Sequence, residues 1–126
     1  MIAWLFTDKL SDFDPGFNDR SIIWIVASAV VLGPIIETSM LVAVLGLAMH
    51  LSASRGFSII FSAAVFAMFH AAFNPYWGLV VFPSFLIFSY VADKYSKQGL
   101  GWSFLSSLLV HVLQNGVATV FVHVGR

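Results

Sequence analysis

VLGPIIETSM, residues 31–40, is the stretch on which the fold depends, because it sets a proline and a carboxylate inside a long apolar run. Residues 21–54 lie between Arg20 and Arg55, and Glu37 is the single formal charge among them. A carboxylate in so apolar a run is costly to keep, so an ionisable group inside a membrane span marks a functional site by default. Such a group needs polar partners, and the rest of the chain must supply them.

The composition assigns the chain to the membrane. Hydrophobic residues make up 60% of its 126 residues, against about 45–50% in soluble domains. Charged residues make up 10%, against about 25% in soluble domains. A soluble fold of this size could not bury so much apolar surface, so we expect membrane lipids as its surroundings. The net charge is zero, which argues against nucleic acid as a partner.

Four apolar segments are separated by short polar stretches, and they cover residues 21–51, 57–73, 76–92 and 102–124. They predict an all-α integral membrane bundle of about four antiparallel transmembrane helices. The first segment, as a straight helix, would be about 45 Å long, whereas the hydrocarbon core is about 30 Å thick. We therefore expect it to be bent or broken near Pro34, whose ring and missing N–H disturb a helix. In the third segment we expect Pro83 to interrupt the helix.

The same pattern divides the chain into two regions. Residues 1–20 are predicted to form an N-terminal arm that is partly interfacial, because Met1–Phe6 is apolar with a Trp and the remainder is polar. Residues 21–126 are predicted to form the transmembrane core, which carries the function.

Three strong polar residues of the later segments are the candidate partners of Glu37: His70, His111 and Asn115. His111 and Asn115 are four residues apart, and so are Phe66 and His70, which places each pair on one face of its helix. A single His in a buried helix is more often a satisfied core residue than a ligand. Three separate apolar segments that each carry such a group favour a shared site. We therefore expect Glu37, His70, His111 and Asn115 to form one polar site inside the bundle.

The order of these motifs resembles the CPBP family of intramembrane proteases, which includes the type II CAAX prenyl endopeptidases and the Abi bacteriocin-immunity proteins. The family pattern is Glu-Glu-x-x-x-Arg, then Phe-x-x-x-His, then His-x-x-x-Asn or Asp, on separate transmembrane helices. The resemblance covers about residues 31–119 and implies that Glu37 is the catalytic base. The chain departs from the first motif, where Thr38 replaces the second Glu and Val42 replaces the Arg.

The resemblance implies an intramembrane endopeptidase that hydrolyses a peptide bond of a membrane-associated polypeptide. It also implies a multi-pass protein of the bacterial plasma membrane. The residues themselves suit this reaction. A desolvated carboxylate is a stronger general base, so Glu37 can activate a water that His70 holds beside it. His111 and Asn115 can donate hydrogen bonds to the oxyanion of the tetrahedral intermediate.

A metal-dependent reaction would use the same residues. Glu37, His70 and His111 match the ligand set of some catalytic zinc sites, with an open position for water. The chain has no His-Glu-x-x-His motif, Asn is a poor zinc ligand, and a metal-bound Glu37 would leave no obvious base. We therefore expect a glutamic mechanism without a cofactor, with zinc as the alternative.

Two other functions fit the same residues. Loss of the second Glu and of the Arg suggests a catalytically inactive relative that acts as a membrane binding or immunity module. A third hypothesis is a small transporter subunit in which Glu37 and the histidines relay protons. A cleavage product separates the protease from both, and replacement of Glu37 by Gln separates a catalytic from a binding role.

Overall fold

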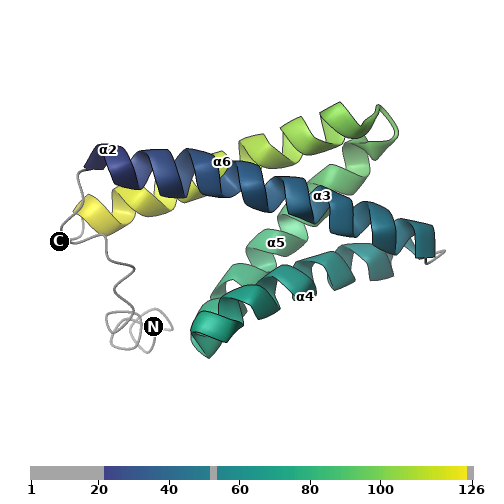
Figure 1. The fold of residues 1–126 in the computed structure, drawn as a ribbon, viewed down its shortest axis with the longest axis horizontal. Helices are drawn as coiled ribbons and strands as arrows, with labels where there is room; N and C mark the ends of the chain where they lie inside the picture. Colours follow the sequence, from purple (N-terminus) through teal and green to yellow (C-terminus); the bar gives the residue numbers. More distant parts are fainter. Residues whose placement is uncertain (1–21, 52–53, 125–126) are drawn as a thin grey trace.

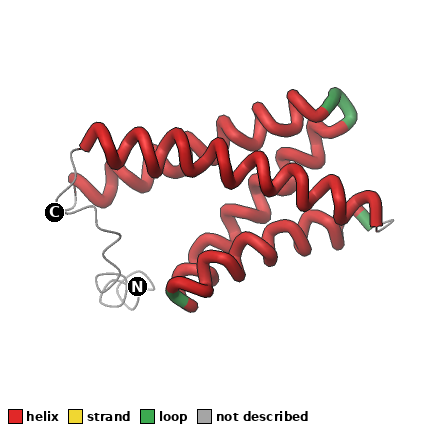
Figure 2. The backbone as a smooth tube through the Cα atoms, viewed as in Figure 1, coloured by secondary structure: helices red, strands yellow, loops and turns green. Residues whose placement is uncertain are grey.

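The computed structural model describes residues 22–51 and 54–124 of the chain, and within them it contains helices and no strand (Figures 1 and 2). The elements are α2 (Ile22–Ile25), the π-helix η1 (Val26–Leu32), α3 (Gly33–Leu51), α4 (Arg55–Phe73), α5 (Pro75–Ser96) and α6 (Leu100–Val124). Because α2, η1 and α3 follow one another without a gap, they form a single rod, called here the first rod. The predicted N-terminal arm, residues 1–20, lies outside the described residues.

The first rod and the three helices that follow it are all long and apolar enough to cross a membrane. The candidate spans are Val26–Leu51, Arg55–Phe73, Pro75–Ser96 and Leu100–Phe121. Many large apolar side chains are exposed on their outer surfaces, as expected of a bundle whose solvent is lipid. The predicted all-α membrane bundle is confirmed, and the chain is an integral membrane protein.

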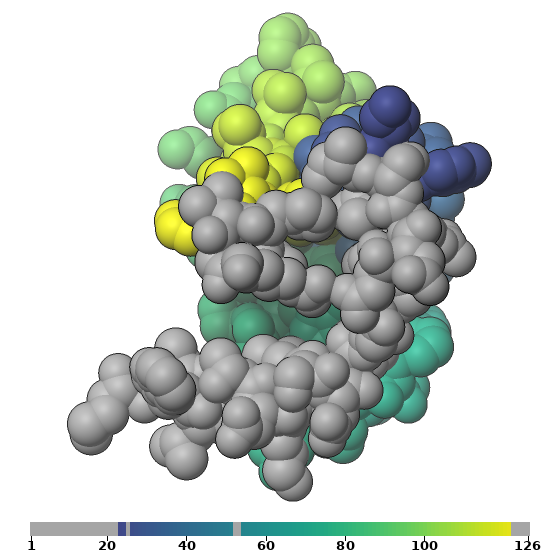
Figure 3. Space-filling view, turned by 90° about the vertical axis from the view of Figure 1, so that its left-hand side faces the viewer, coloured from purple at the N-terminus to yellow at the C-terminus, as the bar shows by residue number. Residues whose placement is uncertain are grey.

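The helices pack as antiparallel neighbours, which their short connections predict. Figure 1 shows α6 running beside the first rod in the opposite direction, while α4 and α5 form a hairpin against this pair. The start of the first rod lies beside the end of α6, as Figure 3 also shows from a second direction. α5 crosses obliquely from the turn after α4 to the turn before α6, so it contacts both helices.

The interruption predicted near Pro34 takes the form of a change in helical register. η1 covers Val26–Leu32, and the α-helical register of α3 begins at Gly33, directly before Pro34. In a π-helix each N–H donates to the carbonyl five residues earlier, and Pro34 has no N–H with which to continue that series. The π register therefore ends at Pro34. The first rod is not broken there, because the α-helical register of α3 continues it directly (Figure 1). Glu37 lies one turn into this α-helical part.

α5 tolerates a proline without any such change. It begins at Pro75, a residue suited to the first position of a helix. Asn74 caps it, because the Asn74 Oδ1 accepts a hydrogen bond from the Tyr76 N–H at 2.9 Å. The helix then runs through Pro83 to Ser96, so the interruption predicted at Pro83 does not end it.

α4 and α5 pack closely against each other at Gly78. Gly78 of α5 is buried, and a Cβ there would lie 2.6 Å from the Ala71 Cβ and 2.7 Å from the Ala67 carbonyl oxygen. Only glycine allows this approach, and small residues serve the same purpose in other membrane helices. His70 and Trp77 are the chain neighbours of this contact. The contact therefore brings α5 against the end of α4 that carries His70.

Serine side chains attach α6 to α5. The Ser103 Oγ donates to the Ala92 carbonyl at 2.8 Å, and the Ser107 Oγ donates to the Phe88 carbonyl at 3.0 Å. Both serines are buried, and hydrogen bonds of this kind join helices in lipid. His111 follows Ser107 by one helical turn on the same face. The serine contacts thus orient the face of α6 that carries a candidate site residue.

Candidate active site

Glu37 borders a pocket of about 450 Å³ whose lining comes from α3, α4 and α5. The lining residues are Glu37, Met40, Phe66, Phe69, His70, Phe73 and Trp77. Glu37 and His70 are the titratable groups of that lining, and the other side chains are apolar or aromatic. The Glu37 side chain is 34% exposed, so its carboxylate is accessible from the pocket although its surroundings are apolar.

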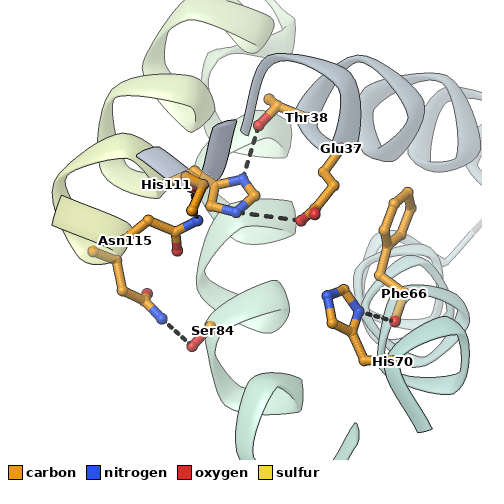
Figure 4. A network of polar contacts seen from close by, with 9 residues as sticks. Glu37, Thr38, Phe66, His70, Ser84, His111 and Asn115 are labelled. Carbon is orange, nitrogen blue, oxygen red and sulfur yellow. Dashed lines mark hydrogen bonds and ion pairs between the residues drawn. The ribbon is translucent and has the colours of Figure 1, made fainter. Parts of the chain in front are cut away.

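His111 of α6 is buried and, unlike Glu37, does not line the pocket. Its Nε2 is 3.4 Å from the Glu37 Oε2, and its Nδ1 is 3.1 Å from the Thr38 Oγ1 (Figure 4). The imidazole therefore bridges two consecutive residues of α3. The ring of Phe88 stacks against it, with the ring centroids 4.2 Å apart. These contacts hold the ring with Nε2 directed at the carboxylate.

His70 approaches the pocket from the last turn of α4. Its Nδ1 donates to the Phe66 carbonyl at 2.8 Å (Figure 4). Because a carbonyl oxygen can only accept, Nδ1 carries a hydrogen, and Nε2 of the neutral ring keeps its lone pair. Trp77 packs edge-on against the imidazole, with the ring centroids 5.1 Å apart. Residue 66 thus orients the ring of His70 through its backbone carbonyl, which any residue type at that position would supply.

Phe85 of α5 lies between the two histidines. Its ring centroid is 5.2 Å from that of His70 and 5.9 Å from that of His111. Phe85 and Phe88 are both buried, so they pack inside the bundle and do not face lipid. Their rings form an apolar wall that limits access of water to both imidazoles from the side of α5.

Asn115 lies one turn beyond His111 on α6, and its amide contacts the first rod. The Asn115 Nδ2 donates to the Ala29 carbonyl of η1 at 2.8 Å. In the π register the Ala29 carbonyl would pair with the N–H of residue 34, and Pro34 has none. A carbonyl without a partner is costly in a bilayer. The Asn115 amide therefore supplies the hydrogen bond that Pro34 cannot, and this uses one of its two hydrogens.

The four predicted site residues do not all line the same pocket. Glu37 contacts His111 and shares its pocket with His70, whereas Asn115 is bonded to η1. Their convergence on one cavity stays a prediction, because His111 and Asn115 are not part of the pocket lining. Across residues 22–51 and 54–124, no three His, Asp or Glu side chains are grouped so that they could hold a metal ion. The alternative zinc ligands Glu37, His70 and His111 are not assembled as such a group.

Thr38 is a residue beside the site whose contact with His111 was not predicted from the sequence. In the sequence it is only a departure from the family pattern, yet it is 1% exposed and hydrogen bonds to His111. Val42 is also buried, at 7% exposure. The sequence did carry one signal, since residues 38 and 42 are four apart and share a helix face. Periodicity places both on the inner face but does not tell which side chain of α6 they meet.

The chain was compared with models of protein families. Residues 19–117 match the family model described as type II CAAX prenyl endopeptidase Rce1-like. The match covers more than half of the 126 residues and includes all four predicted site residues. No curated protein and no solved structure matches the chain. The family is one of CAAX-type intramembrane endopeptidases, so the match confirms the resemblance inferred from the three motifs.

Proposed function

The chain belongs to the type II CAAX prenyl endopeptidase Rce1-like family, and from that premise we propose that it is an intramembrane endopeptidase of the glutamic type. It hydrolyses a peptide bond of a membrane-associated polypeptide, with Glu37 as the general base. The position of Glu37 carries the proposal. Its carboxylate borders an apolar pocket, shares that pocket with His70 and lies 3.4 Å from the His111 Nε2.

The first step is activation of water. Glu37 takes a proton from a water in the pocket, and the hydroxide oxygen attacks the carbonyl carbon of the scissile bond. A carboxylate with little water around it is a stronger base for this transfer. The Nδ1 hydrogen of His70 is committed to Phe66, so its Nε2 accepts the second hydrogen of the water. His70 thereby fixes the orientation of the attacking oxygen.

The second step is stabilisation and collapse of the intermediate. The attack turns the carbonyl oxygen into an oxyanion. Its donors in this proposal are the second Asn115 N–H and the His111 Nε2–H, which faces the Glu37 carboxylate at rest and is released when Glu37 takes the proton. Collapse re-forms the carbonyl, breaks the C–N bond and leaves the electron pair on nitrogen. Glu37 then returns its proton to the leaving amine. Neither donor lines the pocket at rest, so binding of the substrate must bring them and the oxyanion together. Hydrogen bonds to the developing charge then lower the barrier.

The outer part of the pocket supports a substrate that arrives from the membrane. Met40, Phe69 and Phe73 line the pocket and are 47%, 56% and 78% exposed. Exposed apolar side chains of a membrane bundle face lipid. A polypeptide segment can therefore reach Glu37 from the bilayer through an apolar opening. The proposal places the protein in a bacterial plasma membrane, which fractionation of cell membranes tests.

A catalytically inactive relative that acts as a membrane binding or immunity module is the second candidate function. Positions 38 and 42 favour it, because buried Thr38 and Val42 stand where the family pattern has Glu and Arg. In that case the pocket binds a segment of a partner protein, and Glu37 serves only as a polar contact.

Replacement of Glu37 tests the proposal against this alternative. Membranes that contain wild type, Glu37→Gln or Ser39→Ala are compared, and new peptide N-termini are identified by mass spectrometry. Ser39 is a matched control, because it is exposed on the same helix and bonds to the Ile35 carbonyl. Wild type and Ser39→Ala should give the same new N-termini, and Glu37→Gln should give none at an equal amount of membrane protein. Biological activity that persists in Glu37→Gln would favour the binding module.

Chelation tests the glutamic type against the zinc type. Cleavage should survive exhaustive chelation, and the purified protein should carry well under one zinc per chain. Loss of cleavage that added Zn²⁺ restores would reassign the roles. His70 and His111 would then be ligands, and Glu37 would be a ligand or the base for a zinc-bound water.

A further inference from the structure

The direction of the hydrogen bond between Thr38 and His111 determines the tautomer of His111. The Thr38 Oγ1 and the His111 Nδ1 are 3.1 Å apart, and the two residues are 1% and 3% exposed. A hydroxyl can donate or accept, and so can the Nδ1 of an imidazole, depending on its tautomer. Which atom supplies the hydrogen decides which nitrogen of His111 carries the ring hydrogen.

The hydroxyl side of this contact favours Thr38 as the donor. A hydroxyl has one hydrogen to give, and His111 is the only hydrogen-bond partner of the Thr38 Oγ1 among the described residues. If Nδ1 were the donor, the hydroxyl hydrogen would have no acceptor in a fully buried position. A buried donor without an acceptor is strongly unfavourable.

The other side of the ring gives the same answer. The His111 Nε2 lies 3.4 Å from the Glu37 Oε2, and an ionised carboxylate has no hydrogen to donate. A bare Nε2 would therefore set one lone pair against another. With the hydrogen on Nε2, the neutral ring has a lone pair on Nδ1, and the Thr38 hydroxyl must be its donor.

We propose that Thr38 is a positioning residue whose hydroxyl donates to the His111 Nδ1 and holds the imidazole as the tautomer with hydrogen on Nε2. His70 is held in the opposite tautomer, because its Nδ1 faces a carbonyl that can only accept. One imidazole thus offers a lone pair to the reaction, and the other offers an N–H. The catalytic consequence rests on the proposed function, and so does the ionised Glu37 of the Nε2 argument. The argument from the Thr38 hydroxyl does not.

The proposal changes the meaning of the departure at position 38. The family pattern has Glu there, and an ionised Glu can only accept a hydrogen bond. The Thr38 hydroxyl can therefore donate a hydrogen bond to the His111 Nδ1, where an ionised Glu could only accept one. This contact is compatible with a neutral His111 that donates through Nε2. A chain without the second Glu can in this way keep an N–H available for an oxyanion.

Nitrogen NMR of the imidazoles tests the tautomer directly. Protein labelled with ¹⁵N at histidine is placed in nanodiscs, and long-range ¹H–¹⁵N spectra distinguish protonated from bare ring nitrogens. The His111 signals are assigned by their absence in His111→Gln. The expected result is a bare Nδ1 and a protonated Nε2 in wild type and in Thr38→Ser. A protonated Nδ1 in wild type would overturn the proposal.

Glu37→Gln separates the influence of Thr38 from that of the carboxylate. An amide can face either nitrogen, so this variant leaves Thr38 alone to select the tautomer. The hydrogen should stay on Nε2 in Glu37→Gln, and both tautomers should appear in Glu37→Gln combined with Thr38→Val. Two tautomers already present in Glu37→Gln would show that Thr38 does not hold the ring. These spectra are decisive even if the protein cleaves nothing.

Kinetics then measure the consequence for the proposed reaction. Thr38→Val should lower kcat about 10- to 100-fold, by analogy with loss of the hydrogen-bond partner of a metal-bound imidazole, and should leave KM nearly unchanged. Thr38→Ser should restore most of kcat, and Ser39→Ala should match wild type. Equal rates for Thr38→Val and wild type would overturn the positioning role. An active Glu37→Gln would instead refute the glutamic mechanism and leave the tautomer result standing.

Discussion

The two histidines on either side of Glu37 are held in different ways. On the side of α4, His70 is oriented by Phe66, which is four residues earlier on the same helix. On the side of α3 and α6, His111 bonds to Thr38 across 73 residues of sequence. On that side Asn115 also bonds to Ala29 across 86 residues. The α4 side is thus built from a local contact, and the α3–α6 side from contacts between the first rod and the last helix.

This difference indicates how each side should respond to change. The orientation of His70 needs only that the last turn of α4 is helical. The orientation of His111 and Asn115 needs the assembled bundle and the register of the first rod. Glu37 belongs to both sides, because it shares the pocket with His70 and contacts His111.

The largest effect is expected for Glu37→Gln, which removes the group common to both sides. An amide cannot take a proton from water, so the cleavage rate should fall by about 10²–10⁴-fold, the usual contribution of a general base. The measurement is the initial rate on the peptide that wild type cleaves, with Ser39→Ala as the control. A rate within a factor of ten of wild type would remove Glu37 from the role of base.

The next largest effects on the cleavage rate are expected for replacement of the two histidines. His111→Ala removes one oxyanion donor and should lower the rate by about 10²–10³-fold. It should also lower the thermal stability, because the buried Thr38 hydroxyl loses its partner. His70→Ala should lower the rate as well but change the stability less, since its bond lies within α4. Unfolding in detergent is followed by circular dichroism, and equal stability losses would contradict the distinction between local and long-range sides.

The same distinction explains what the sequence could predict. The four spans followed from apolar length, and the shared face of Phe66 and His70 followed from helical periodicity. Both are local properties of the chain. The partner of Thr38 depends on how α6 is rotated against α3, which the serine contacts of α6 help to set. No local pattern contains that rotation, so the contact of His111 with Thr38 and the bond of Asn115 to η1 could not be predicted.

Prolines show a second limit of local prediction. Pro34 and Pro83 carry the same local signal, a missing N–H inside an apolar run. In the structure, the missing N–H of Pro34 is accommodated by a π register and by a side-chain donor from α6. In contrast, α5 keeps its α-helical register through Pro83. Neighbouring helices can satisfy the backbone groups that a proline leaves unpaired in a membrane. Which neighbour does so is a property of the bundle.

A smaller effect is expected from the coupling of Asn115 to Pro34. In wild type, Asn115→Ala leaves the Ala29 carbonyl without a donor and should cost about 1–3 kcal/mol of stability. In a Pro34→Ala background, residue 34 has an N–H that can pair with that carbonyl, so the cost should be smaller. A double-mutant cycle should therefore give a coupling energy of about 1 kcal/mol.

Gln114→Ala is the matched control for this cycle, because Gln114 is exposed next to Asn115 and bonds to Ser84 of α5. Its cost should be the same with and without Pro34. The cycle is measured by equilibrium unfolding of the reconstituted protein in SDS. An equal cost of Asn115→Ala in both backgrounds would mean that the amide does not replace the missing N–H.

The smallest effect on activity is expected at Asn74, which repeats the local arrangement of the α4 side. It lies four residues after His70, so α4 carries its own His-x-x-x-Asn spacing. Its side chain, however, caps α5 through the Tyr76 N–H, and its backbone N–H donates to the His70 carbonyl at 3.1 Å. Asn74→Ala should cost about 1 kcal/mol of stability and leave the cleavage rate nearly unchanged. Asn74→Ser keeps a capping oxygen and should restore the stability. If both variants lost about 10²–10³-fold in rate, the loss expected for an oxyanion donor, Asn74 would be acting on the substrate, and the α4 side would be more than a local support.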